Sequence, residues 1–346
     1  MQVQELLDSL YKDHEGTVGI LLHVESPSQR ISWTSAVGVA DTLSKEPLQN
    51  EHPVLIASNT KPYVAASILR LVEQETIKLD DPIQKLLGKK TRRLFEKDGY
   101  DLKAISVRHL LSHTSGIHDY VNEAYFEFVN QHPAYNWQKE EQLTRAVEVG
   151  DPLWAPGTAY GYADVNYLLL TEILERKTGK PFHAAIRDLL KFDSLGIRRT
   201  WFKDLEPFPA ETLPLAHQYA DTYGWDSYKI DHSWDLYGGG GMAATVKDAA
   251  LFFQYLFEGK MVSDTAVLKQ MHTYVLPKET SNYCLGIRNI PLPNQHLYYH
   301  GGWWGTGVVY SPETRSTVAV FTLQKGKRER INPFLGKKIQ EMLLAE

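Results

Sequence analysis

The pattern of hydrophobic and polar positions divides the chain into two strand-rich ends and a helical middle. Near the N-terminus, T-V-G-I-L-L-H-V-E-S and Q-R-I-S-W-T-S-A-V-G are β-rich runs on either side of residues 26–28, which predicts a hairpin. Near the C-terminus, Q-H-L-Y-Y-H, T-G-V-V-Y-S and S-T-V-A-V-F-T-L predict three more strands, with a turn at residues 312–315 between the last two.

Apolar residues at helical spacing predict a helix at each end of the chain. In the first helix the recurring apolar side chains are Leu6, Leu7, Leu10 and Tyr11. The last helix is predicted over residues 331–344, and its apolar side is formed by Leu335, Ile339, Met342 and Leu343.

The middle of the chain, residues 58–279, is predicted to be mostly helical. Two helices are expected to begin after Ser106 and Thr245, because both residue types favour the N-cap position. A third helical pattern, V-N-Y-L-L-L-T-E-I-L-E-R, follows the turn Pro156-Gly157.

Strands at both ends with helices between them predict an α/β (α+β) fold of two parts. We expect an antiparallel sheet, built from both chain ends and flanked by helices, over residues 1–57 and 280–346. A mainly helical domain would be inserted at residues 58–279, with the active site between the two parts.

Composition narrows the classes of partner. The 346-residue chain has a net charge of −5 and no basic block, which argues against nucleic acid. Its single cysteine, Cys284, excludes an internal disulfide and a multi-cysteine zinc site. No apolar run approaches the length of a membrane span. We expect a cytoplasmic protein if Met1 is the native start, and a periplasmic or extracellular one if a signal peptide was removed.

Ser58 and Lys61, in I-A-S-N-T-K-P-Y-V-A-A-S-I-L-R-L-V, form the most informative motif. Residues three apart share a helical face, so an amine would lie beside a hydroxyl. Pro62 places Ser58 at or beside the helix N-terminus, where the helix dipole favours an alkoxide. A lysine sheltered from water near positive dipoles loses its proton more easily and can act as a base. The alternative is an N-cap serine and a surface lysine, since so short a pattern also occurs by chance.

Tyr162 lies in P-G-T-A-Y-G-Y-A-D-V-N-Y-L-L-L, between a Pro-Gly turn and a helix. We expect its phenol to project into a cleft, where a tyrosine near ammonium groups can move protons. The alternative is a half-buried ring whose hydroxyl is hydrogen-bonded.

His300 ends a predicted strand in Y-Y-H-G-G-W-W-G-T-G-V-V-Y-S-P-E and is followed by Gly301 and Gly302. Glycines at this point let a substrate backbone lie against the strand edge. The N–H of Trp303 is placed to act as an oxyanion donor together with the N–H of Ser58. The alternative is a tight turn beside a solvated histidine.

Together these stretches resemble the serine β-lactamase and penicillin-binding-protein superfamily, on its class C, DD-peptidase and esterase side. I-A-S-N-T-K is similar to the nucleophile helix of that family, Y-G-Y-A-D-V-N to its Y-x-N region and Y-H-G-G to its K-T-G strand. I-S-V-R-H-L-L-S-H-T-S-G-I and G-G-G-G-M-A-A-T-V-K-D-A-A are similar to two further stretches of this branch. The likeness spans nearly the whole chain.

The resemblance implies a role for each of these residues. Ser58 would be the acylated nucleophile of an ester or amide hydrolase, with Lys61 as its activating amine. Tyr162 would carry protons to and from the leaving group, and His300 would add positive potential and anchor the substrate. The N–H groups of Ser58 and Trp303 would form the oxyanion hole. The expected partner is a small molecule or short peptide, with no cofactor and no metal.

Two departures from the family pattern narrow the range of substrates that we expect. Asp164 stands where the family often has asparagine, and an ionised aspartate can bind Lys61 but cannot donate to an acylamide carbonyl. His300 replaces lysine, so a weaker anchor for a β-lactam carboxylate should follow. We expect Asp164, Gly301 and Gly302 to contact the substrate, and a β-lactam not to be the preferred donor.

Several alternatives stay open at this point. Within the same class, the chain would be a true β-lactamase, a D-alanyl-D-alanine carboxypeptidase or a D-aminopeptidase. From another class, it would be a non-catalytic sensor of peptides or β-lactams with the same fold. A metal site at His113 and His118 is disfavoured, because no H-E-x-x-H pattern accompanies them. The oligomeric state is left open.

Overall fold

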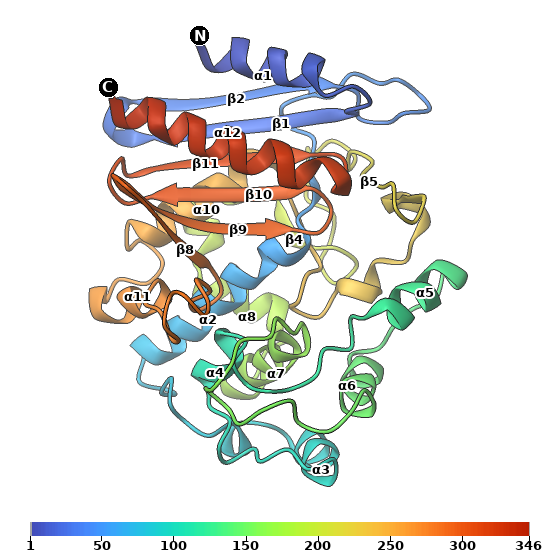
Figure 1. Cartoon of the computed structure of the whole chain (residues 1–346), viewed down its shortest axis with the longest axis vertical. Coiled ribbons are helices and arrows are strands. Elements are labelled where there is room, and N and C mark those ends of the chain that lie inside the picture. The colour runs from blue at the N-terminus through green and yellow to red at the C-terminus, as the bar shows by residue number, and fades with distance from the viewer. Residues whose placement is uncertain (1, 346) are drawn as a thin grey trace.

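The computed structural model describes residues 2–345 and is built around a six-stranded antiparallel sheet (Figure 1). The strands lie in the order β2-β1-β11-β10-β9-β8. Their bounds are β1 Gly19–Ser26, β2 Ile31–Gly38, β8 Arg288–Leu292, β9 Gln295–Gly302, β10 Thr306–Ser311 and β11 Ser316–Thr322. Strands β1 and β11 join the two chain ends, with Ile20 opposite Thr322. The prediction of an antiparallel sheet built from both ends is confirmed.

Strand β8 is the one strand of this sheet that the sequence does not predict. Its segment R-N-I-P-L contains Pro291, and proline normally counts against a strand because it has no N–H to donate. Strand β8 pairs only with β9 and is an edge of the sheet, where a proline is tolerated.

Helices α1 (Gln2–Asp13) and α12 (Lys325–Ala345) cover one face of the sheet, and α12 crosses its front in Figure 1. Alternate strand positions point to this face, so that Leu22 and Val320 pack with Ile339 of α12. Helix α12 begins at Lys325, earlier than predicted. The sequence pattern does not reveal this start, because the first turns, K-G-K-R-E-R, contain no apolar positions that could indicate a helix.

Helix α10 (Val246–Phe257) packs on the opposite face, against β11, β1 and β10. Thr245 caps it as predicted, since Oγ1 of Thr245 accepts a hydrogen bond from the N–H of Asp248. The middle of the chain therefore contributes directly to the packing of the terminal sheet.

The regular secondary structure of the rest of the middle segment is mainly helical, as predicted. Its helices are α2 Lys61–Glu73, α3 Lys89–Lys97, α4 Val107–Leu111, α5 Glu123–Gln131, α6 Lys139–Glu148, α7 Val165–Thr178, α8 Phe182–Leu189, α9 Phe192–Leu195 and α11 Thr265–Met271. None of the helices that the structure describes combines the length and hydrophobicity needed to cross a lipid bilayer.

Two small sheets, which lie in this segment except for strand β3, are not predicted by the sequence. One has the order β3-β7-β4, with bounds β3 Val54–Leu55, β7 Met242–Ala244 and β4 Thr200–Phe202. The other pairs β5 Tyr219–Ala220 with β6 Trp225–Asp226. Strands of two or three residues are too short to show the alternating pattern that reveals a longer strand.

The packing of α12 on the sheet gives a test of stability. Ile339 is fully buried there, whereas the adjacent Lys338 is exposed. Replacing Ile339 by alanine leaves a cavity, so we expect Ile339→Ala to lower the free energy of unfolding by about 2–5 kcal/mol in urea titrations. Lys338→Ala, on the same helix, should change it by less than about 0.5 kcal/mol. Equal effects of the two substitutions would contradict this account of α12.

Candidate active site

A cavity of about 530 Å³ brings together most of the residues that the sequence singles out. The predicted site residues that line it are Ser58, Tyr162, Asp164, His300, Gly301 and Trp303. Lys61 is fully buried beside Ser58, and Gly302 is buried behind the cavity wall.

Ser58 lies in a short 3₁₀ turn, Ala57–Thr60, that runs directly into α2. Pro62 lies in the first turn of α2, so Ser58 is just ahead of the helix N-terminus, where the sequence places it. The backbone of Ala57 is left-handed, with φ of 46°, which costs a residue with a Cβ roughly 1–2 kcal/mol. Backbone strain of this kind persists only where the surrounding structure holds it.

Lys61 is the first residue of α2 and is fully buried. Its Nζ lies 3.1 Å from Oγ of Ser58, 2.5 Å from the carbonyl oxygen of Gly239 and 2.5 Å from Oδ1 of Asp164. An ammonium group has three N–H donors, and these three acceptors use all of them. The surroundings of Lys61 therefore favour the charged form.

The pKa of Lys61 moves in the opposite direction to the one that the sequence suggests. Burial lowers the pKa of Lys61, but the charge of Asp164, followed by Tyr162 and Asp235, outweighs burial and raises the pKa above its ordinary value. The expectation that shelter from water would free the amine is wrong for the resting site. The same fold that buries Lys61 brings carboxyl groups to it from distant parts of the chain.

Tyr162 lies against this ammonium group, with Nζ of Lys61 4.8 Å from the centre of its ring. Burial raises the pKa of the Tyr162 phenol above its usual range, and the neighbouring charge of Lys61 offsets this only in part. The resting phenol is therefore neutral and has a proton to give.

His113 clamps the backbone on both sides of Tyr162, which the sequence does not reveal. Its carbonyl oxygen accepts the N–H of Gly161 at 3.0 Å, and its Nδ1 accepts the N–H of Ala163 at 3.2 Å. Its ring centre lies 4.2 Å from that of Tyr162, and Nδ1 also faces the side-chain amide of Asn166 at 3.2 Å. Burial lowers the pKa of His113 well below its usual range, so the ring is neutral with its proton on Nε2.

His300 is also neutral, which corrects the expectation that it adds positive potential. Its Nδ1 donates to the carbonyl oxygen of Gly301, and its Nε2 accepts from the hydroxyl of Tyr283, each at 3.0 Å. Burial, followed by the nearby charges of Lys61 and Arg288, lowers the pKa of His300 well below its usual range. The strand position that carries lysine in the family pattern therefore carries no cation here.

Charged residues that the sequence does not single out line the same cavity. Arg288 on β8 and Lys325 on α12 supply positive charge, and no carboxylate lies within ion-pair distance of either among residues 2–345. Asp119 and Asp235 come from the helical segment and supply carboxyl groups. No local sequence pattern marks these residues, because only the tertiary fold brings them to one cavity.

The strand edge beside Ser58 is closed by direct contacts with the 3₁₀ turn. In the orientation that satisfies both ends of its side-chain amide, Asn59 donates to the carbonyl oxygen of His300 at 2.9 Å and accepts the N–H of Gly302 at 3.2 Å. A Cβ at Gly302 would overlap the carbonyl oxygen of Ile56, so only glycine allows this approach.

Trp303 and Trp304 have different surroundings. Trp303 lines the cavity and stacks on Phe126, with ring centres 5.8 Å apart, whereas Trp304 is buried in the core. Within residues 2–345, no acceptor is described for the main-chain N–H of Ser58 or of Trp303.

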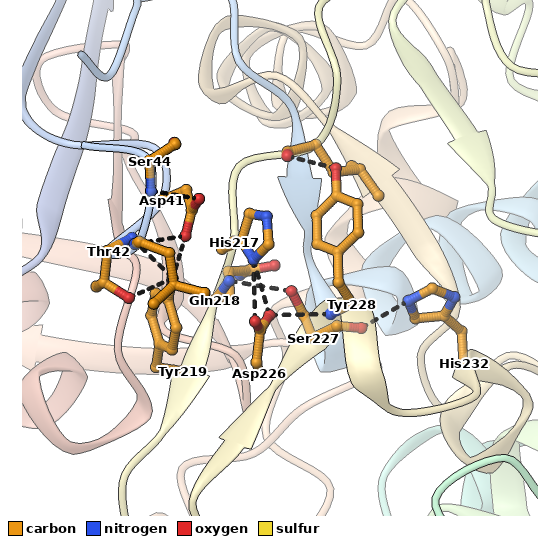
Figure 2. Close-up of polar contacts among 12 residues, drawn as sticks. Asp41, Thr42, Ser44, His217, Gln218, Tyr219, Asp226, Ser227, Tyr228 and His232 are labelled. Atoms are coloured by element: carbon orange, nitrogen blue, oxygen red, sulfur yellow. Dashed lines mark hydrogen bonds and ion pairs between the residues drawn. The ribbon is translucent and has the colours of Figure 1, made fainter. Parts of the chain in front are cut away.

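A polar network behind the site holds the segment that precedes the 3₁₀ turn. The buried side chain of Gln218 accepts the N–H of Leu55 at 2.8 Å and donates to the carbonyl oxygens of Leu55 and Trp304, both at 3.0 Å. Figure 2 shows the neighbouring part of this network, in which Nδ1 of His217 lies 2.9 Å from the carboxylate of Asp226. Among the residues described, no three His, Cys, Asp or Glu side chains are arranged to hold a metal ion.

Comparison with known proteins agrees with this geometry. The chain is 23% identical over 315 residues to penicillin-binding protein 4* of Bacillus subtilis (strain 168), which covers 88% of this chain and 66% of that protein. It is 32% identical over 184 residues to esterase EstB of Burkholderia gladioli, covering 51% of this chain and 45% of that protein. The chain thus spans no more than about two thirds of the length of these relatives.

A solved structure and a family model extend the likeness to nearly the whole chain. D-amino acid amidase from Ochrobactrum anthropi SV3 superposes with a TM-score of 0.78 at 25% identity, covering 99% of this chain and 100% of that one. A family model described as Beta-lactamase matches residues 9–339. The resemblance inferred from the motifs is confirmed, and the chain belongs to the beta-lactamase family of serine hydrolases.

Proposed function

We propose that this chain hydrolyses ester or amide substrates through a covalent acyl-enzyme on Ser58. The observation that carries the proposal is the position of Ser58. Its Oγ lies 3.1 Å from the buried Nζ of Lys61, and Ser58 lines a cavity of about 530 Å³ at the start of a helix. A nucleophile in hydrogen-bond contact with a group that can move its proton is the arrangement that acyl transfer requires.

Acylation begins when Oγ of Ser58 attacks the substrate carbonyl carbon. As the bond to the leaving group breaks, Tyr162 gives its phenolic proton to the departing alcohol or amine. Lys61, which has taken the serine proton, then returns a proton to Tyr162. Water attacks the acyl-enzyme along the reverse path, which releases the acid and restores the Ser58 hydroxyl.

Because Lys61 rests as an ammonium, it has to give away a proton before it can take one from Ser58. The carboxylate of Asp164, at 2.5 Å, is the acceptor within reach. The proton moves from Lys61 to Asp164, and the resulting neutral amine accepts the proton of Ser58. The site favours the ammonium form of Lys61, so this transfer is uphill and takes place together with the attack of Ser58, which returns a proton to the amine. The asparagine common at this position in the family could not accept that proton.

The main-chain N–H groups of Ser58 and Trp303 form the oxyanion hole in this proposal. The absence of a described acceptor for either group supports the assignment, because both donors are left for the oxygen of the tetrahedral intermediate. Asn59 and Gln218 hold the two segments that carry these groups.

Esters and amides are better supported as substrates than β-lactams. A neutral His300 offers no charge to a β-lactam carboxylate, and Asp164 offers no donor to an acylamide carbonyl. Within the ester and amide class, the names of the relatives include an esterase and a D-amino acid amidase. The intact contact of Ser58 with Lys61 argues against a sensor that has lost its chemistry.

The first prediction tests the nucleophile. Ser58→Ala removes the only oxygen that this proposal acylates, so hydrolysis of p-nitrophenyl acetate should fall to the level without enzyme. A fluorophosphonate probe should label the wild-type chain once and leave the variant unlabelled. Near wild-type esterase activity in Ser58→Ala would exclude the proposal.

The second prediction tests the proton path through Asp164. Asp164→Asn keeps the shape of the side chain but removes the proton acceptor, and general acid–base steps contribute about 10²–10⁴-fold. We expect kcat for p-nitrophenyl acetate to fall by about 10²-fold or more. The substitution also removes the charge that raises the pKa of Lys61. A retained rate whose pH profile moves to lower pH would therefore mean that Lys61 acts directly, without Asp164.

The third prediction tests the clamp on Tyr162. His113→Asn keeps a hydrogen-bond acceptor and tolerates the left-handed backbone of this position, whose φ is 57°. His113→Phe keeps an aromatic ring but loses the acceptor. We expect kcat to fall about 10²-fold in the phenylalanine variant and less than about 10-fold in the asparagine variant, with little change of KM. Melting temperatures separate loss of fold from loss of positioning, and equal kcat losses in two folded variants would argue against the clamp.

A further inference from the structure

Asp235 presents a buried carboxyl group without a partner in the cavity wall. It ends the 3₁₀ turn His232–Asp235, is 9% exposed and lines the same cavity as Ser58. Within residues 2–345, no hydrogen bond or ion pair of its carboxyl oxygens is described, and burial and charge alone set its titration. Burying a carboxylate without a partner is costly, so this position suits a group that arrives with a ligand.

The lack of a side chain at Gly240 leaves space for the carboxyl group of Asp235. A Cβ at Gly240 would overlap both carboxyl oxygens of Asp235, so a side chain at residue 240 would displace the carboxyl group from this position. The preceding residue, Gly239, accepts the hydrogen bond from Lys61 at 2.5 Å. The carboxyl group of Asp235 therefore lies against the residue that follows this acceptor, and within residues 2–345 no hydrogen bond or ion pair joins it to Ser58 or Lys61.

Lys61 does not serve as the counter-ion of Asp235. The three donors of Lys61 are already directed at Ser58, Gly239 and Asp164. Burial, followed by the negative charge of Asp164, raises the pKa of Asp235 to about 8, so its carboxyl group is mostly neutral at pH 7 in the free protein. A cation bound beside it would favour ionisation and gain a charge-assisted hydrogen bond.

Aromatic rings surround the same part of the cavity. Trp234, directly before Asp235, lines the cavity with Phe126 and Trp303. The ring centres of Trp234 and Trp303 are 5.3 Å apart, and those of Phe126 and Trp303 are 5.8 Å apart. Aromatic faces attract an ammonium group and also pack against an apolar side chain. A carboxyl group beside aromatic rings matches the two sides of an amino acid, its amine and its apolar side chain.

We propose that Asp235 binds the free α-ammonium group of the acyl donor. The substrates are then amides, esters or short peptides of an apolar or aromatic amino acid with an unblocked amine. The inference rests on the proposed function, because Ser58 has to attack the carbonyl group next to that ammonium. Asp235 makes the site selective for this class and takes no part in breaking the bond.

The test compares substrates that differ only at the amine. The kcat/KM values of alanine and phenylalanine p-nitroanilides, each as both enantiomers, are measured against those of their N-acetyl derivatives. We expect the wild-type protein to prefer the free amine by 10-fold or more for at least one enantiomer. In Asp235→Asn that preference should fall at least 10-fold. Since each ratio is taken within one enzyme, a general loss of reactivity cancels.

Asp193→Asn is the matched control, because its side chain is 89% exposed on α9 and does not line the cavity. It removes the same charge and should leave the preference unchanged. An unchanged preference in Asp235→Asn, or a wild-type preference for the N-acetyl substrates, would overturn the inference. Ser58-dependent hydrolysis of p-nitrophenyl acetate is measured in parallel, and its absence would instead refute the proposed function.

If no anilide is cleaved, a binding experiment tests whether the site recognises the free ammonium group. Phenylalaninamide should slow labelling of Ser58 by a fluorophosphonate in the wild-type protein, and N-acetylphenylalaninamide should not. The protection should be lost in Asp235→Asn and kept in Asp193→Asn. Equal protection by the two amides, or none by either, would contradict a site for the ammonium group.

Discussion

Burying a lysine requires a partner for its charge and an acceptor for each of its three N–H bonds. In this chain the acceptors of Lys61 come from three segments that are far apart in sequence, represented by Ser58, Asp164 and Gly239. The start of α2, the start of α7 and the glycine run before β7 are therefore held at one point. These segments form walls of the cavity, so the hydrogen bonds and ion pair of a single ammonium group fix the positions of those walls.

That arrangement also determines which groups are charged. Lys61 and Asp164 form the central ion pair, while burial keeps His113 and His300 neutral. The site thus has fixed charges at its centre and neutral, hydrogen-bonded rings around it. In the mechanism proposed above, proton transfer depends on this pair and not on a histidine that titrates near neutral pH.

Much of this could be predicted from the sequence, where the signals are local. The start of α2 at Ser58, the cap at Thr245 and the long terminal strands follow from residue types and spacing over a few positions. The family motifs also indicated that Ser58, Tyr162 and His300 would share one site, and the cavity brings them together.

The rest depends on contacts between distant segments. Edge strand β8 contains Pro291, and the two small sheets are too short for a pattern. The raised pKa of Lys61 depends first on Asp164, which lies in another part of the sequence. The neutral state of His300 likewise follows from a hydroxyl supplied by Tyr283. The charge states of buried groups depend on tertiary contacts, so they cannot be predicted from a short stretch of sequence.

The pairing of β1 with β11 has a consequence for the way the protein is made. Strand β1 is synthesised before the helical middle of the chain, and its central neighbour β11 is synthesised after it. The hairpin β1–β2 can pair with β11 only after the helical middle has been synthesised, and such non-local pairing is slow to form. During that interval its apolar residues, such as Leu21 and Leu22, lack their final cover. Uncovered apolar surface exposes the nascent chain to aggregation, and Ser58 has no finished strand edge beside it until β9 has been synthesised.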